Sequence, residues 1–522
     1  MAVYQDRVRD LTLRLCAIPS VNGTQGEADL LDAAHQLLAG VTAGAGELRI
    51  FRGPDRRGRP AFVLAHLRGT GPRAVLQFGH VDTVGVADFG PLRHLAFDPV
   101  ALTRRVADGA LGQELAVLAQ SGAWLFGRGT LDMKAGLAAS LAVLERFARR
   151  GERGHLLVAF TSDEEAGSHG IHALTEFLGP YLEAEGLELV GIVNTDATGP
   201  RPGLAGPRDR FAYAGSVGKL LPCAYVRGVP SHVGEPETGL DPDVVLAELT
   251  RRVVYAERLR DGAGHERTAH PVSLGARDDK GSYDVQTPLS ATGCYNVLYV
   301  ERSPGDVLTA LHGIAEEAVA AAQATLRAAF GQAPEIRVYT FAELLARARA
   351  QGIPFDAALA LGAAGETTGP APRIRAVQDL ADAVLGREPA VVLFVGSALI
   401  PKVASAGAGL AALQGVLARH AARSGNVYHL GRFFPLISDL SFVARSPDWQ
   451  DPAIPANDPL GGLADRPTGP ALACDAVFMV GPHGEGAHRV DERLFVPYSF
   501  EDVPELLTDL TEALWHPAEP AP

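Results

Sequence analysis

Four short apolar runs that alternate with helical patterns constrain the fold of this 522-residue chain most strongly. The runs, which are rich in Val, Leu and Phe, span residues 61–65, 74–78, 156–160 and 189–193. This composition is typical of strands that are buried on both faces. Between the second and third runs, residues 133–149 carry a continuous Ala and Leu face that predicts a helix. Strand and helix in alternation indicate an α/β fold, a mostly parallel sheet flanked by helices.

The pattern changes near Gly215, where we expect a second domain. A helix, a strand, an Ala-rich helix and a further strand are predicted at residues 241–259, 293–300, 307–330 and 336–341. The charged, Gly-rich stretch 262–284 is expected to be a loop. After Phe341 the α/β pattern returns. We therefore predict an α+β lid or dimerisation domain at 214–341, inserted into a catalytic domain made of residues 1–213 and 342–522.

The amino-acid composition limits the classes of partner that the chain is expected to bind. Lys and Arg number 47 and Asp and Glu 61, so the net charge of −14 argues against binding to nucleic acid or to an anionic membrane. No apolar run is long enough to span a bilayer, and the charged N-terminus lacks the apolar core of a signal peptide. The four cysteines lie far apart without a CxxC pair, so reduced thiols and a cytoplasmic location are expected.

Histidine and carboxylates follow the predicted strands. His80 and Asp82 come directly after one run, a Glu164–Glu165 pair follows another, and Asp196 follows a third. Asp132 precedes the long helix, where it would also suit a helix N-cap. Because ligands bind at the carboxyl ends of parallel strands, these segments are expected to deliver their side chains to one edge of the sheet.

This set of side chains predicts a site for two divalent metal ions. His80 would bind metal while Asp82 holds its other ring nitrogen, and Asp132 would bridge the two ions. A second histidine must come from the C-terminal loop, which offers His483 and His488.

Mixed His and carboxylate ligands suit zinc, with cobalt or manganese as alternatives. Asp132, Glu165 and Asp196 would leave the two ions with a net charge of about +1, and such a site lowers the pKa of bound water from about 15.7 toward about 7. Glu164, which is then not a ligand, would accept the proton.

The motifs resemble those of the dizinc metallohydrolases, which include acetylornithine deacetylase, succinyl-diaminopimelate desuccinylase, carboxypeptidase G and related dipeptidases. The motifs are Gly79-His-Val-Asp82, Gly127-Arg-Gly-Thr-Leu-Asp-Met-Lys134, Thr161-Ser-Asp-Glu-Glu165 and Ala487-His488-x-x-x-Glu492. Four further stretches are similar to the longer RocB-type proteins of arginine utilisation: Asn194-Thr-Asp196, Gly215-Ser-Val-Gly-Lys-Leu-Leu221, Ser231-His-Val-Gly-Glu-Pro236 and Ile437-Ser-Asp-Leu-Ser441.

The resemblance implies a role for each residue. It places His80 and Asp196 on one metal, Glu165 and His488 on the other, and Asp132 between them. Glu164 is then the general base, and Asp82 orients His80. In the inserted domain His232 matches a histidine that helps bind the substrate carbonyl, and Arg302 loosely matches an arginine that takes a substrate carboxylate. The His-x-x-x-Glu spacing favours His488 over His483.

Two departures bear on specificity. Many deacylases of the family have Gly-Glu-Pro-Thr/Ser where this chain has Thr195-Asp196-Ala197-Thr198, which is closer to the peptidase-like members. The segment 342–431 is longer than in the short relatives, so the shape of their pockets cannot be transferred.

The expected function is metal-dependent hydrolysis of an amide bond in a small N-acyl amino acid or a short peptide, which would make the chain a deacylase or dipeptidase. The alternative is a non-catalytic relative that keeps the fold and binds an amino-acid-like ligand. A serine hydrolase is disfavoured because the chain has no Gly-x-Ser-x-Gly motif. A homodimer through the inserted domain is left open.

Overall fold

A computed structural model of the chain describes residues 4–41, 47–150, 154–201, 203–357, 369–444, 446–461 and 472–516. The chain forms two compact units. The first comprises Met1–Ser216, Val403–Arg445 and Pro467–Pro522, and the second comprises Val217–Lys402 and Ser446–Arg466. The predicted inserted domain, 214–341, is therefore too short. The second unit continues to Lys402, and the chain returns to it for a further short segment.

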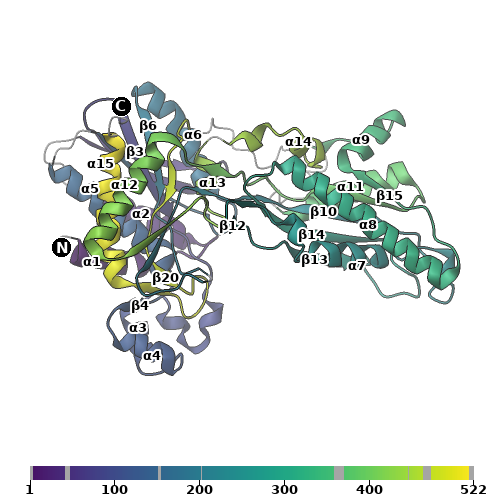
Figure 1. The fold of residues 1–522 in the computed structure, drawn as a ribbon, viewed down its shortest axis with the longest axis horizontal. Helices are drawn as coiled ribbons and strands as arrows, with labels where there is room; N and C mark the ends of the chain where they lie inside the picture. The colour runs from purple at the N-terminus through teal and green to yellow at the C-terminus, as the bar shows by residue number, and fades with distance from the viewer. Residues whose placement is uncertain are drawn as a thin grey trace. The chain divides into compact units, whose positions relative to one another are not determined.

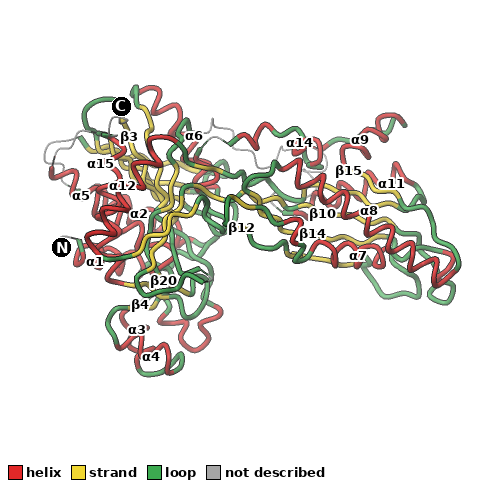
Figure 2. The backbone as a smooth tube through the Cα atoms, viewed as in Figure 1, coloured by secondary structure: helices red, strands yellow, loops and turns green. Residues whose placement is uncertain are grey.

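The first unit is built on an eight-stranded, mostly parallel sheet, drawn in yellow in Figure 2. Its strands run in the order β1 (Leu48–Pro54), β2 (Pro60–Leu67), β5 (His155–Thr161), β3 (Arg73–His80), β6 (Glu188–Asn194), β19 (Val477–Met479), β7 (Asp209–Tyr213) and β18 (Val427–Gly431). The central pairs β5–β3, β3–β6 and β6–β19 are parallel. The four predicted strands of this sheet, β2, β3, β5 and β6, are confirmed, together with the α/β class.

Helices bury both faces of this sheet. Every residue of β5 is buried, as expected for a central strand covered on both sides. The helices around the sheet are α1 (Gln5–Cys16), α2 (Gln25–Ala39), α5 (Ala135–Arg150), α6 (His169–Ala184), α12 (Gly407–Ser424) and α15 (Val503–Trp515). The predicted helix over 133–149 is α5, whose Ala and Leu face packs into the main core.

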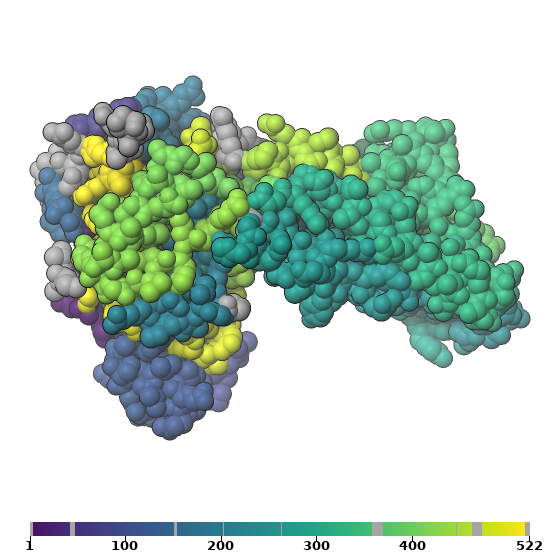
Figure 3. Space-filling view, viewed as in Figure 1, coloured from purple at the N-terminus to yellow at the C-terminus, as the bar shows by residue number. Residues whose placement is uncertain are grey.

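A small helical lobe projects from the first unit, in blue at the foot of Figures 1 and 3. It contains η1 (Ala87–Leu95), α3 (Pro99–Ala107), α4 (Gln113–Gln120) and β4 (Trp124–Phe126). Its own apolar cluster includes Phe89, Leu102, Val106 and Phe126. β4 also pairs with β21 (Arg493–Phe495), which pairs in turn with β20 (Gly484–Glu485), so the lobe is joined to the C-terminal loop.

The second unit has a sheet with helices on both faces. Its strands run in the order β13 (Val272–Asp278), β14 (Ser290–Tyr299), β10 (Pro222–Arg227), β16 (Ala390–Val395) and β15 (Arg337–Thr340), with β9 (Gly218–Leu220) also on β14. Alternate residues of β10 point to opposite faces. Ala224 and Val226 pack with α7 (Pro242–Val253) and α8 (Pro304–Phe330), whereas Cys223 and Tyr225 pack with α9 (Phe341–Ala350) and α11 (Pro370–Leu385).

The structure corrects two further expectations. The stretch 262–284 is not only a loop, because it contains the edge strand β13. Cys223 and Cys294 face each other on β10 and β14 and form a disulfide, contrary to the expectation of reduced thiols. The remaining short elements are β8 (Gly215–Ser216), β17 (Val403–Ala404), β11 (Gly262–Ala263), β12 (Glu266–Arg267), α13 (Leu440–Val443) and α14 (Ala453–Asn457). No helix in the described ranges combines the length and apolarity needed to cross a membrane.

Candidate metal centre

Three neighbouring parallel strands bring most of the predicted donors to one edge of the sheet. β3 ends at His80, and β5 and β6 lie on either side of it. The loop after β5 carries Glu164 and Glu165, and the loop after β6 carries Asp196. The sheet topology therefore gathers the side chains where parallel strands generally place a ligand.

Asp132 reaches this edge from the loop before α5, and its peptide bond to Met133 is cis. Glu492 holds the loop, because its carboxylate accepts the N–H groups of Leu131 at 3.2 Å and Asp132 at 3.3 Å. Arg128 donates to the other oxygen of Glu492 at 2.6 Å. The side chains of Glu492 and Arg128 are each 1% exposed. The C-terminal loop that carries Glu492 thus anchors the loop that carries Asp132.

The two oxygens of Asp132 face different histidines. Nε2 of His80 lies 3.1 Å from Oδ1, and Nε2 of His488 lies 3.2 Å from Oδ2. Nε2 of His80 is also 3.8 Å from Asp196, and Nε2 of His488 is 3.1 Å from Glu165. The structure therefore brings all five predicted ligands together, with Asp132 in the middle. Its carboxylate is directed at the histidines, and no hydrogen bond among the described residues joins it to an amide of α5, so the alternative of a helix cap is not what the structure shows.

The same geometry separates the two candidate histidines of the C-terminal loop. His488 adopts a left-handed backbone conformation, with φ of 65°, and turns its ring toward Asp132 and Glu165. His483 is buried among Phe211, Phe495 and Tyr498, where burial lowers the pKa of its ring to about 4. The histidine that the His-x-x-x-Glu spacing favours is therefore the one whose ring faces Asp132 and Glu165.

Asp82 differs in part from its expected role. His80 Nδ1 lies 3.0 Å from the main-chain oxygen of Asp82 but 3.6 Å from its carboxylate. The carboxylate instead accepts the backbone N–H groups of Glu164, at 3.2 Å, and Glu165, at 3.0 Å. Although burial raises it, the pKa of Asp82 is held below its usual range by the His80 ring and these contacts. Asp82 therefore positions the glutamate pair as well as the histidine.

Glu164 is surrounded by other carboxylates. Burial, together with the negative charges of Asp439 and Asp196, raises its pKa well above the usual value, even though the His80 ring opposes the shift. Burial and the charge of Asp132 likewise raise the pKa of Asp196 to about 7. Within the described ranges, no ion pair links either carboxylate to a Lys or Arg side chain.

Asp439 is the member of this cluster that sequence reasoning missed. It directly precedes α13, is 2% exposed, and its carboxylate forms no ion pair with a Lys or Arg side chain within the described chain. Burial raises its pKa to about 7, although a hydrogen bond from the Ser168 hydroxyl opposes the shift. Its neighbour Ser438 is tied to the loop after β6, because Asn194 donates to the Ser438 hydroxyl at 2.9 Å. The only sequence signal was its place in the Ile437–Ser441 motif, which carried no assigned chemistry.

The donor set fits divalent cations. His80, Asp132 and Glu165 offer nitrogen and oxygen atoms that all lie within 4.8 Å of one another. Hydrogen bonds that the His488 ring donates to the carboxylates of Asp132 and Glu165 raise its pKa to about 10, so this ring and these acids favour a positive charge between them. Imidazole nitrogens among buried carboxylates form a donor set that divalent metal ions can bind.

The two predicted substrate residues lie in the second unit. His232 is exposed, and its Nδ1 accepts the N–H of Gly234 at 3.1 Å. Arg302 is partly buried, and its guanidinium donates to the carbonyl oxygen of Arg258 at 3.0 Å. Its backbone N–H is bound by Asp261 at 2.9 Å. Both residues are described within their own unit only, and their part in binding substrate stays a prediction.

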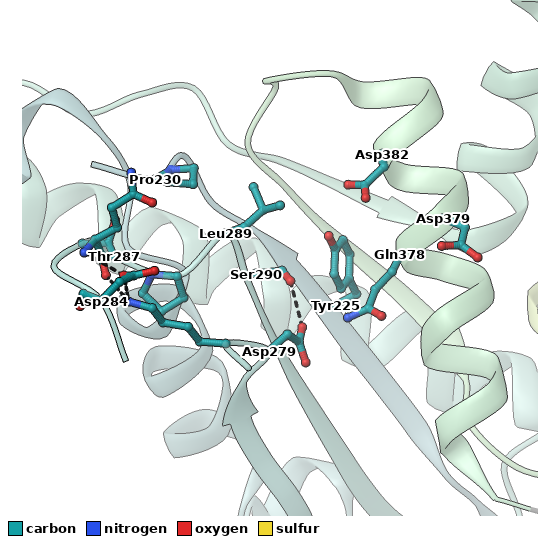
Figure 4. A pocket seen from close by; sticks show the side chains of 13 residues that line it. Tyr225, Pro230, Asp279, Asp284, Thr287, Leu289, Ser290, Gln378, Asp379 and Asp382 are labelled. Carbon is teal, nitrogen blue, oxygen red and sulfur yellow. Dashed lines mark hydrogen bonds and ion pairs between the residues drawn. The ribbon is translucent and has the colours of Figure 1, made fainter. Parts of the chain in front are cut away.

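A polar cavity of about 380 Å³ lies in the second unit (Figure 4). Tyr225 of β10, Asp279 and Ser290 face Gln378 and Asp379 of α11 across it. The hydroxyl of Ser290 donates to Asp279 at 2.9 Å. None of the predicted site residues lines this cavity, so it is separate from the donor cluster of the first unit.

Comparison with known proteins identifies the family. The model of peptidase family M20/M25/M40 matches residues 112–385, which is more than half of the 522 residues. The chain belongs to this family. Protein YqjN of Bacillus subtilis (strain 168) is 32% identical over 469 residues, which cover 86% of this chain and 85% of YqjN. Protein RocB of the same organism is 29% identical over 542 residues, 97% of this chain and 94% of RocB.

Solved structures agree on the fold of this M20 chain. Aminopeptidase PepT from Bacillus cereus superposes with a TM-score of 0.54 at 13% identity, covering 98% of this chain and 100% of PepT. Identity this low supports the architecture alone. The expected resemblance to the metallohydrolases, with RocB-type proteins among the relatives, is confirmed at the level of the family.

Proposed function

We propose that this M20 chain is a metal-dependent hydrolase that cleaves an amide bond in a small N-acyl amino acid or a short peptide. The observation that carries the proposal is the Asp132 carboxylate, whose two oxygens face His80 and His488 at 3.1 and 3.2 Å. A carboxylate shared in this way is suited to bridge two metal ions. His80 and Asp196 would complete one ion site, and Glu165 and His488 the other.

The two ions, most suitably zinc, would supply a Lewis acid for water and for the amide carbonyl. The remaining steps fall to the chain itself. Glu164 carries no ligand role, and its raised pKa suits a group that must accept a proton and later release it. It takes one proton from the attacking water and delivers it to the leaving nitrogen as the C–N bond breaks. Asp82 keeps Glu164 in place through the backbone N–H at 3.2 Å.

Substrate recognition is proposed for His232 and Arg302. The exposed imidazole of His232 can donate a hydrogen bond to a substrate carbonyl. Arg302 would have to give up its bond to the Arg258 carbonyl to bind a carboxylate, which makes it the weaker candidate of the two. Replacing His232 with Ala should raise KM or lower kcat while leaving the metal content unchanged. A homodimer through the second unit is proposed alongside, and light scattering in solution tests it.

The decisive experiment for this function is Glu164→Gln in metal-loaded protein. Wild type is screened against N-acyl amino acids and dipeptides by following amine release. The variant should lose at least about 1,000-fold in kcat because it lacks the base, while its metal content stays at the wild-type level. A variant with more than a tenth of the wild-type kcat would contradict the role of Glu164. Wild type that binds metal and hydrolyses none of these compounds would favour a non-catalytic binding protein.

A further inference from the structure

The turn that carries Glu164 and Glu165 depends on contacts from outside itself. It starts at Asp163, whose φ of 68° lies in the left-handed region that non-glycine residues seldom adopt. It ends at Ser168, with φ of 54°. Such a conformation persists only when neighbouring groups hold it.

Two acids hold the turn from opposite sides. Asp82 accepts the N–H groups of Glu164 and Glu165, as described above. Asp163 accepts the N–H of His169 at 3.3 Å and also contacts the His169 ring. Asp82 is 0% exposed and Asp163 is 7% exposed. Both carboxylates are buried, so their charges are costly unless hydrogen-bond donors offset them.

Asn22 supplies such a donor. Its side-chain Nδ2 donates to Oδ2 of Asp82 at 3.0 Å and to Oδ1 of Asp163 at 3.1 Å. A carboxamide has two N–H bonds in a fixed fork, so one group can serve both acceptors at once. Among the described residues, Asn22 is the only side chain with hydrogen bonds to both acids.

The N-terminal loop holds Asn22 in turn. Its backbone N–H donates to the carbonyl oxygen of Thr83 at 2.9 Å, which ties it to the segment that carries Asp82. Glu27 accepts the N–H of Gly23 at 2.8 Å and that of Asp163 at 3.0 Å, so it links the loop to the start of the turn. Residues 20–27, which form the end of the loop after α1 and the first turn of α2, therefore contact both the segment that carries Asp82 and the start of the turn that carries the glutamate pair.

We propose that Asn22 is a positioning residue, which sets the orientation of Glu164 and Glu165 by joining Asp82 to Asp163. The inference rests on the proposed function for the assignments of Glu164 as base and Glu165 as metal ligand. It concerns the geometry of the glutamate pair, however, and that geometry can be measured without turnover. Asn22 itself makes no contact with the reacting atoms.

The test uses Asn22→Asp, Asn22→Ala and Asn22→Ser in the full-length protein loaded with Co²⁺. Asn22→Asp keeps the shape, removes both donors and adds a third carboxylate. Asn22→Ser keeps one donor. The expected order of kcat is wild type, Ser, Ala, Asp, with a loss of about 10–100-fold across the series and KM within about threefold. The visible absorption of bound Co²⁺ should shift in the same order, because Glu165 moves with the turn.

Asn426 provides the matched control. Its Nδ2 donates to Asp502 at 2.9 Å in the same unit, outside the cluster around Asp132. The Asn22 and the Asn426 variants should all lower the melting temperature, but Asn426→Asp and Asn426→Ala should leave kcat and the Co²⁺ spectrum unchanged. If Asn22→Asp does not fold, the Ser and Ala variants carry the comparison.

Two outcomes would overturn the inference. One is an Asn22→Ala variant with kcat within threefold of wild type and an unchanged Co²⁺ spectrum. The other is a loss of kcat that the Asn426 variants share, which would show a structural effect only. Failure of the proposed function is distinguishable, because wild type would then lack turnover while the Co²⁺ spectra of the Asn22 series would still answer the question of geometry.

Discussion

Two buried aspartates, one in each unit, differ in the groups that stabilise their negative charge. Asp261 in the second unit is 7% exposed, and one of its oxygens accepts the N–H groups of Val300, Glu301 and Arg302 at 2.8, 2.8 and 2.9 Å. Although burial raises it, the pKa of Asp261 is lowered by these amides. Asp439 in the first unit is 2% exposed and accepts no backbone N–H group within the described chain, and burial raises its pKa to about 7 against the opposing effect of the Ser168 hydroxyl.

This difference distinguishes buried charges that are paired within the fold from the unpaired carboxylates of the candidate metal centre. In the second unit, Arg373 and Asp458 form a buried ion pair at 2.9 Å, so their charges are matched within the fold. At the sheet edge of the first unit, the buried carboxylates outnumber the positively charged side chains that pair with them. Folding alone does not favour an unmatched buried charge, because it costs several kcal/mol. A cluster of such charges therefore indicates that a cation completes the site.

Asp132→Ala should have the largest effect. Loss of the shared carboxylate removes a ligand from both ion sites, so kcat should fall by about 1,000-fold or more. Bound metal, measured by mass spectrometry of the metals in purified protein, should drop from about two equivalents to fewer than one. Asp261→Ala serves as the control from the second unit and should keep both equivalents. Unchanged metal content in Asp132→Ala would contradict the assignment.

The two C-terminal histidines give the next largest contrast. His488→Ala should lose one of two metal equivalents and about 100-fold in kcat, because only this ring faces Asp132 and Glu165. His483→Ala should keep both equivalents and lose stability, because its ring packs among aromatic side chains. Metal analysis and thermal melting of the pair distinguish these results, and the reverse pattern would show that the ligand was assigned to the wrong histidine.

Asp261→Ala should destabilise the second unit by about 2–4 kcal/mol, because buried backbone N–H groups lose their acceptor. Hydrogen–deuterium exchange at Val300, Glu301 and Arg302 measures this directly. Because the folded pKa of Asp261 lies below its usual value, its stabilising contribution is present above about pH 4 and is lost as the pH falls. Exchange at these amides should therefore be least sensitive to the substitution in acid. Equal sensitivity at all pH values would argue against a role for the charge.

Asp439→Asn should stabilise the metal-free protein, whereas Asp261→Ala destabilises it, and its effect should be the smallest of these substitutions. In metal-free protein, folded Asp439 with a pKa of about 7 holds a proton that the unfolded chain releases near pH 4. The free energy of unfolding of wild type therefore decreases as the pH rises from about 4 to about 7. Over this range the free energy of unfolding of the variant should increase by about 1–2 kcal/mol relative to wild type. In the loaded enzyme, removing this charge should move the acidic limb of kcat/KM to lower pH, because Asp439 helps to raise the pKa of Glu164. Urea titrations and a pH–rate profile measure both shifts, and shifts in the other direction would contradict them.

Much of the centre could be predicted from the sequence because the signals are local. His80 follows one predicted buried strand, and Glu164 and Glu165 follow another. These positions identify the donors and predict the sheet edge where they meet. The residue spacing that favoured His488 over His483 agrees with the structure. The helix predicted at residues 133–149 from its Ala and Leu face is α5, which ends at Arg150.

The rest depends on contacts between distant segments. Asp439 and Asn22 lie in loops, and no periodic pattern shows that they approach β3, β5 and β6. The boundary at Lys402 could not be predicted because α9 and α11 resemble helices of the first unit until they pack on β10 and β16. The Cys223–Cys294 disulfide requires the register of β10 against β14, which the spacing of 71 residues does not reveal.

Anomalous diffraction from crystals of the zinc-loaded protein, recorded at the zinc edge, would show whether Asp132 bridges two ions. We expect two peaks about 3.5–4 Å apart, one near each oxygen of Asp132, with His80 and Asp196 on one and Glu165 and His488 on the other. A single peak, or two peaks that do not share Asp132, would contradict this bridging role.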